Sequence, residues 1–113
     1  MSGGRSHVTS HVLDAGTGRP AAGVGVRLEA SAAGTWHEVG AGVTDDDGRV
    51  GSLGPEQLPA GRYRVVFDTA AYFGDRPTFY AEVTIDFLID DPAEHYHVPL
   101  LLSPFAYSTY RGS

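Results

Sequence analysis

The sequence predicts an all-β sandwich of two antiparallel sheets. Apolar and polar residues alternate with a period of two, turn signals recur along the whole chain, and a helical pattern is almost absent. Alternation of this kind is typical of strands with one buried and one solvated face, and regularly spaced turns are typical of sandwiches. We therefore expect about seven or eight strands in a single domain over residues 1–113, of which residues 1–6 are flexible.

The expected strands follow one another in chain order. Val24, Val26 and Leu28 alternate with polar neighbours, and the alternation is clearest from Phe79 to Phe87, where every second residue is apolar. Glycine, proline and aspartate mark turns at residues 16–20, 45–48, 54–55 and 90–92. The strands are expected at 6–15, 24–30, 36–42, 49–53, 63–67, 79–87, 95–102 and 105–111, with one short helix near 69–74.

The run from Val98 to Leu102 is apolar on both faces of its strand. Pro99 lies within it and has no N–H group to donate to a neighbouring strand. We therefore expect either a bulge in this strand or an outer face that another subunit covers.

Composition excludes several classes of function. The net charge of −6 and the isoelectric point near 5.1 argue against a nucleic-acid partner, which usually requires a basic face. The chain has no cysteine, so a disulfide, a thiolate metal site and a cysteine nucleophile are excluded. No apolar run approaches the ~20 residues of a membrane helix. We expect no membrane partner and a cytoplasmic location.

Histidine is the natural base near neutral pH, and the chain has five. His7 and His37 are expected at the surface. His11 and His97 lie in apolar strand patterns, where a lone histidine is more often structural than catalytic. Arg49 follows an Asp-rich turn at residues 45–48, which lacks the ligand spacing of an EF-hand calcium loop.

The chain ends on an aromatic ring, a guanidinium, a glycine and a hydroxyl with a free carboxylate. Ends of chains usually fray, so residues 110–113 are either dispensable or a placed part of a site. Four motifs, including this one, occur together and in order: His11-Val12-Leu13-Asp14, Asp47-Gly48-Arg49, His95-Tyr96-His97-Val98-Pro99-Leu100-Leu101 and Ser108-Thr109-Tyr110-Arg111-Gly112-Ser113. Together they resemble the 5-hydroxyisourate hydrolase family of transthyretin-related proteins, over essentially the whole chain.

The resemblance implies a transthyretin-like sandwich of two four-stranded sheets and a homotetramer whose sites lie in a central channel at subunit interfaces. It implies hydrolysis of 5-hydroxyisourate to 2-oxo-4-hydroxy-4-carboxy-5-ureidoimidazoline in urate degradation, with no cofactor and no metal. By the same resemblance His11, Arg49, His97 and Ser113 are catalytic. Tyr110 and Arg111 bind substrate together with His11 and Arg49.

Two other functions stay open at this stage. Transthyretin itself resembles this chain but lacks the histidines and the Tyr-Arg-Gly-Ser ending, so a carrier of a small ligand without catalysis is one alternative. A metal-binding protein is the other, since His11, His95 and His97 could converge on one ion.

Overall fold

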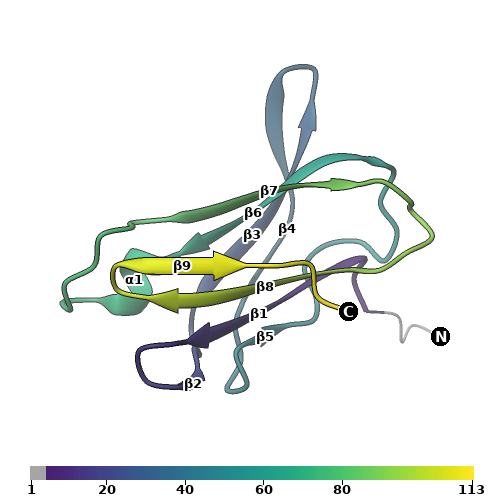
Figure 1. Ribbon diagram of the computed structural model, residues 1–113. Coiled ribbons are helices and arrows are strands. Elements are labelled where there is room, and N and C mark those ends of the chain that lie inside the picture. Colours follow the sequence, from purple (N-terminus) through teal and green to yellow (C-terminus); the bar gives the residue numbers. More distant parts are fainter. Residues whose placement is uncertain (1–4) are drawn as a thin grey trace.

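A computed structural model describes residues 5–113 as two β-sheets packed face to face, with one short helix, α1 (Thr69–Phe73) (Figure 1). The first sheet contains β1 (Val8–Asp14), β2 (Arg19–Pro20), β5 (Arg49–Val50), β8 (Tyr96–Ser103) and β9 (Ala106–Thr109). The second contains β3 (Gly25–Ala32), β4 (Thr35–Val43), β6 (Gly61–Asp68) and β7 (Val83–Ile89). The sandwich and the short helix are as the sequence predicts.

The first sheet has the order β2-β1-β8-β9, with β5 paired to β1, and the second has the order β4-β3-β6-β7. The expectation of two antiparallel sheets is wrong for one ladder, because β1 and β8 run parallel over the whole of β1. These strands come from opposite ends of the chain, so no short hairpin forces them to be antiparallel. The two-residue β2 falls in the expected turn at 16–20 and is too short to show an alternating pattern.

The core lies between the sheets and confirms the period of two. Val12, Leu28, Phe67 and Leu100 are all 0% exposed. Burying each such side chain contributes roughly 1.5–3 kcal/mol, so the inward-facing residues hold the two sheets together. The other core residues of β1, β3, β6, β7 and β8 occupy the same alternating positions, and loops, β5 and α1 supply the rest of the core, including Leu53, Val50 and Phe73.

The strand expected at 79–87 begins later than predicted. Phe79 is 72% exposed, and β7 starts only at Val83. The backbone N–H of Phe79 donates to the Pro104 carbonyl, and the Ala81 carbonyl accepts from Ala70 in α1. The backbone of this segment therefore bonds to a turn and to the helix. It has no neighbouring strand, although its apolar residues alternate as in a strand.

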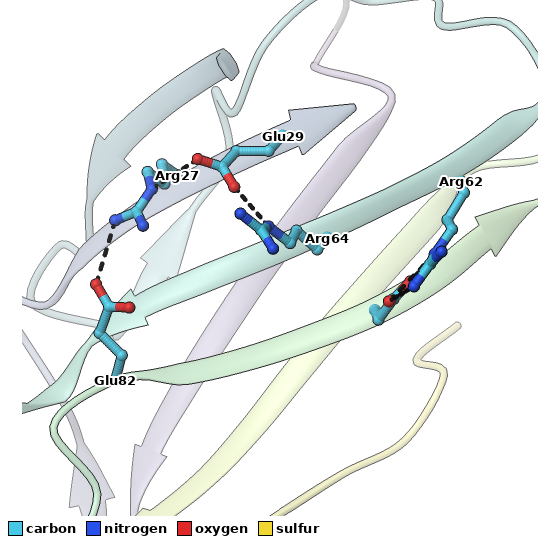
Figure 2. Close-up of polar contacts among 6 residues, drawn as sticks. Arg27, Glu29, Arg62, Arg64 and Glu82 are labelled. Carbon is cyan, nitrogen blue, oxygen red and sulfur yellow. Dashed lines mark hydrogen bonds and ion pairs between the residues drawn. The ribbon is translucent and has the colours of Figure 1, made fainter. Parts of the chain in front are cut away.

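The outer face of the second sheet is covered by ion pairs (Figure 2). Glu29 accepts from Arg64 at 2.6 Å and from Arg27 at 3.0 Å, and Arg62 pairs with Asp86. The hydrogen bond from Arg64, more than any other contact, lowers the pKa of Glu29 below its usual value. These arginines are already paired with carboxylates and are poorly placed to bind a ligand. The candidate functional site is therefore sought on the outer face of the first sheet.

The start of the described chain is packed against the domain. Ser6 is buried, and its hydroxyl donates to the Val8 carbonyl and accepts from the Leu53 N–H. His7 is 5% exposed, so its expected surface position is wrong. Its Nδ1 accepts from the Leu58 N–H at 2.8 Å, and its Nε2 donates to the Glu94 carbonyl at 2.7 Å. Both ring nitrogens are thus used structurally. The rest of the expected flexible segment, residues 1–4, lies outside the described residues.

No helix in residues 5–113 is both long and apolar enough to cross a membrane.

Candidate functional site

The pairing of β1 brings the sequence-predicted residues onto one face of the first sheet. In the parallel ladder Thr9 lies opposite His97, and His11 lies opposite Pro99. In the antiparallel ladder with β5, His11 lies opposite Arg49. Residues two apart on a strand share a face, and the alternate residues of β1 point into the core. Thr9, His11, Arg49 and His97 therefore project outward together.

Arg49 is held by the turn that precedes it. The Asp45 carboxylate accepts from the backbone N–H of Asp47 at 2.9 Å and of Arg49 at 3.0 Å. The hydrogen bond from Arg49 is the main cause that lowers the pKa of Asp45. Gly48 adopts a φ of 74°, and its carbonyl accepts from the Val12 N–H at 2.7 Å. The Asp-rich turn therefore ties Arg49 to β1, as a structural turn would.

Pro99 determines where β9 ends. The register of β8 with β9 would place Tyr110 opposite Pro99, but the ladder stops at Thr109. Pro99 has no N–H to donate there, and its carbonyl accepts from the Thr109 hydroxyl at 2.6 Å instead. The β1–β8 register runs without a shift past Pro99, so β8 contains no bulge at this position. The missing hydrogen bond lets the tail leave the sheet.

The tail then returns to β8 at a single point. The Gly112 N–H donates to the His97 carbonyl at 2.9 Å, which forms an isolated bridge. A Cβ atom at Gly112 would lie 2.5 Å from Cδ2 of the His97 ring and 3.1 Å from Cγ of Pro99. Gly112 is thus required by close contact with the imidazole, and its φ is not positive. This contact places Ser113 beside His97.

Three of the four residues predicted to be catalytic line one cavity of about 220 Å³. They are Arg49, His97 and Ser113, which are accompanied by Arg5 and Thr9. His11 is half-buried and adjoins this cavity through its pairing with Arg49, although it is not among the residues that line it. Segments that are far apart in the sequence thus meet where the tail ends.

Tyr110 and Arg111 line a second cavity of about 350 Å³ that shares only His97 with the first. The Arg111 guanidinium donates to the Glu94 carboxylate at 3.1 Å and lies 4.4 Å from the centre of the Tyr96 ring. These two residues therefore adjoin the first cavity and do not line it.

Burial and neighbouring cations favour neutral imidazoles at this site. Burial lowers the pKa of His97, and Arg49 and His11 lower it further. Burial also lowers the pKa of His95, with a further contribution from Arg5. A neutral imidazole can accept a proton, so His97 is suited to act as a base near neutral pH.

Thr9 and Arg5 are site residues that the sequence analysis missed. Thr9 lies two positions before His11 on the same strand, so the period of two could have placed it on the same face. Arg5 fell in the segment expected to be flexible, and only the packing of Ser6 and His7 brings it to the cavity. In residues 5–113, no three His, Asp or Glu side chains are arranged to hold a metal ion.

Comparisons with known proteins identify the family of this chain. The model of the HIUase/Transthyretin family matches residues 8–112. The chain is 47% identical to a 5-hydroxyisourate hydrolase of Salmonella dublin, over 100% of this chain and 85% of that protein.

Solved structures of two kinds are similar to this one. The 5-hydroxyisourate hydrolase of Klebsiella pneumoniae has a TM-score of 0.83 and 38% identity, covering 94% of this chain and 98% of that one. Sea bream transthyretin in complex with thyroxine has a TM-score of 0.87 and 37% identity, covering 93% of each chain. The match over nearly every described residue and the full-length identity to a hydrolase place this chain in the HIUase/transthyretin family.

Proposed function

We propose that this protein hydrolyses 5-hydroxyisourate to 2-oxo-4-hydroxy-4-carboxy-5-ureidoimidazoline, a step of urate degradation. The observation that carries the proposal is the cavity in which Arg49, His97 and Ser113 meet. The proposal is also supported by similarity, over nearly the whole of this chain, to proteins named 5-hydroxyisourate hydrolase.

Hydrolysis of a ring amide needs a base, a charge that stabilises the oxyanion, and donors that hold the planar ring. His97 or His11 takes the proton of the attacking water. The Arg49 guanidinium stays charged at every relevant pH and binds the carbonyl oxygen on which negative charge develops. The Ser113 hydroxyl donates to the substrate. The proton taken from water is then available to the ring nitrogen that leaves.

Tyr110 and Arg111 are proposed to bind the same substrate with His11 and Arg49. Their cavity adjoins the first one at His97, so a ligand that extends past the imidazole would meet them. Arg111 would then add a cation and Tyr110 an aromatic face for the planar ring.

We further propose a homotetramer with the sites at subunit interfaces. Large apolar side chains at the ends of the first sheet are exposed in one subunit, with Phe105 at 64% and Tyr110 at 61%. Exposed apolar patches of this kind favour assembly. Light scattering after gel filtration tests the subunit number. The cytoplasmic location also stays a proposal, which cell fractionation would test.

The activity is tested by generating 5-hydroxyisourate in place from urate with a urate oxidase and following its ultraviolet decay. We expect the protein to accelerate the decay over the spontaneous rate. His97→Ala and Arg49→Ala should lose most of this acceleration, whereas His37→Ala, on exposed β4, should retain it. An unchanged decay rate in the presence of the wild-type protein would overturn the proposal.

A carrier of a small ligand remains the second candidate, because sea bream transthyretin in complex with thyroxine is as similar in structure as the hydrolase. A His11→Ala protein that hydrolyses the substrate at the wild-type rate would favour this candidate.

A further inference from the structure

The Thr9 side chain lies between two histidines, His97 in β8 and His95 in the loop before β8. Its Oγ1 is 2.8 Å from Nδ1 of His97 and 2.9 Å from Nε2 of His95. Thr9 is 6% exposed, and its Cα is the register partner of His97 in the parallel ladder. The hydroxyl is therefore fixed by the backbone of both strands and has little access to water.

A hydroxyl has one hydrogen to donate and two lone pairs that accept. The Thr9 hydroxyl can thus donate to only one of the two ring nitrogens, and it is able to accept from the other. For His97 to act as a base toward the cavity, its lone pair must be on Nε2 and its hydrogen on Nδ1, because Nδ1 already contacts Thr9. In that state Nδ1–H of His97 donates to Thr9, and Thr9 donates to Nε2 of His95.

We propose that Thr9 and His95 are positioning residues, which act through the Thr9 hydroxyl to hold His97 with Nε2 as the nitrogen that takes the proton of the attacking water. The inference rests on the proposed function and names two further residues for it. As the water oxygen bonds to the carbonyl carbon, its proton moves to Nε2 and His97 becomes a cation. The Nδ1–H donor then bonds Thr9 more strongly, since a charged donor makes a stronger hydrogen bond.

The surroundings explain why such an acceptor is needed. Burial disfavours a proton on His97 most, and Arg49 on β5, His11 on β1 and Arg5 before β1 disfavour it further. Arg5 and His7 likewise face His95. The Thr9 oxygen accepts from Nδ1–H and so opposes these effects when the cation forms. Ser113 lines the same cavity as this ring.

The test replaces Thr9 with valine, which keeps the shape and removes the hydroxyl. We expect kcat to fall about tenfold or more, with a much smaller change in KM, since one hydrogen bond to a charged group is lost. The acidic limb of the kcat profile should move to lower pH, because the His97 cation loses its acceptor. Thr9→Ser should restore both. Thr35→Val is the matched control, since it removes a Thr–His hydrogen bond of 2.9 Å from exposed β4.

A second measurement needs no substrate. Nitrogen-15 spectra of ring-labelled histidine should show His97 with its hydrogen on Nδ1 in the wild-type protein and a mixture of tautomers in Thr9→Val. If the wild-type protein does not hydrolyse 5-hydroxyisourate, the proposed function fails, while these spectra still decide whether Thr9 holds the ring.

Two results would overturn the inference. One is a His97 spectrum that is the same in wild type and Thr9→Val, and the other is a Thr9→Ser protein as impaired as Thr9→Val. If Thr9→Val fails to fold by circular dichroism, His95→Gln tests the same link. It should shift the acidic limb in the same direction and weaken the Nδ1 preference, and a wild-type profile and spectrum would contradict the proposal.

Discussion

At the scale of the residue, the site depends on side chains whose neighbours decide their state. His97 is an ordinary strand histidine by type, but burial and Arg49 keep its pKa low, and Thr9 occupies its Nδ1. His7 shows the opposite outcome, since both of its ring nitrogens bind backbone groups and none is left for chemistry. His7, directly before β1, and His97, the second residue of β8, thus differ because of how each is packed.

The lowered pKa of His97 predicts the pH dependence of hydrolysis. A base with a lowered pKa stays unprotonated over a wider range, so kcat/KM should hold as pH falls to the ordinary histidine value of 6.5 and decline only below it. The Arg49→Gln variant lacks one of the charges that lower the pKa of His97. The acidic limb of its kcat/KM profile should therefore lie at higher pH than that of the wild type, although the variant is slower. Arg64→Gln, on the other sheet, is the control. A wild-type limb above 6.5 would contradict this assignment.

Gly112 predicts a loss of turnover without a loss of fold. In Gly112→Ala the new methyl group would meet the His97 ring at 2.5 Å, so either the ring or the tail must move. A displacement of this size can cost about a hundredfold in kcat. Thermal unfolding should change little, because Gly112 lies beyond the last strand. Gly25→Ala, where the nearest atom is 3.8 Å away, is the control, and equal rates for the two variants would refute the prediction.

At the scale of the element, short segments place the site more than the long strands do. The two-residue β5 puts Arg49 beside His11, and the turn before it supplies the hydrogen bonds that hold it. Pro99 ends the β8–β9 ladder and so releases the tail toward the cavity. A short strand and the end of a ladder thus place Arg49 and the tail near the candidate site.

The turn before β5 predicts a measurable difference between two glycines. Gly48 and Gly18 have similar φ values of 74° and 76°, but only a Cβ at Gly48 would collide with the Val12 carbonyl oxygen. Alanine at either position should lower the free energy of unfolding by about 1 kcal/mol for the backbone strain. Gly48→Ala should lose clearly more, and it should also lower kcat by displacing Arg49. Urea unfolding that gives equal losses would show that the collision is relieved at no cost.

At the scale of the whole molecule, the two outer faces of the sandwich differ in kind. The second sheet presents matched ion pairs (Figure 2), whereas Arg49, His97 and Ser113 line a cavity at the first sheet. These groups lie on one sheet because β1, near the start of the chain, pairs with β8, near its end.

The position of Ser113 predicts an asymmetry between the two ends of the chain. A tag added after Ser113 would start from a residue that lines the cavity of about 220 Å³ and would displace it, so turnover should fall about tenfold or more. A tag of equal length before Met1 should reduce it much less. Gel filtration with light scattering should show the same assembly for both proteins. Equal rates would mean that the tail is not part of the site.

The sequence by itself determined the class of fold, most strand positions, the helix and the residues that we propose to be catalytic. The alternation of apolar and polar residues is a local property. It therefore identified strands that pack one face against the core, such as β3 and β6. It misled at Phe79, because the same alternation arises in a segment that has no partner strand. The candidate residues came from motifs, which need no knowledge of distance.

Only the tertiary structure decided which of these residues meet. The parallel β1–β8 ladder, the burial of His7, the contact of Gly112 with His97 and the hydroxyl of Thr9 between two histidines all join segments distant in the sequence. A local pattern cannot report them, because strand partners and their register are chosen by the packing of the whole sandwich. That packing separated Arg111 from the first cavity and brought Arg49, His97 and Ser113 together.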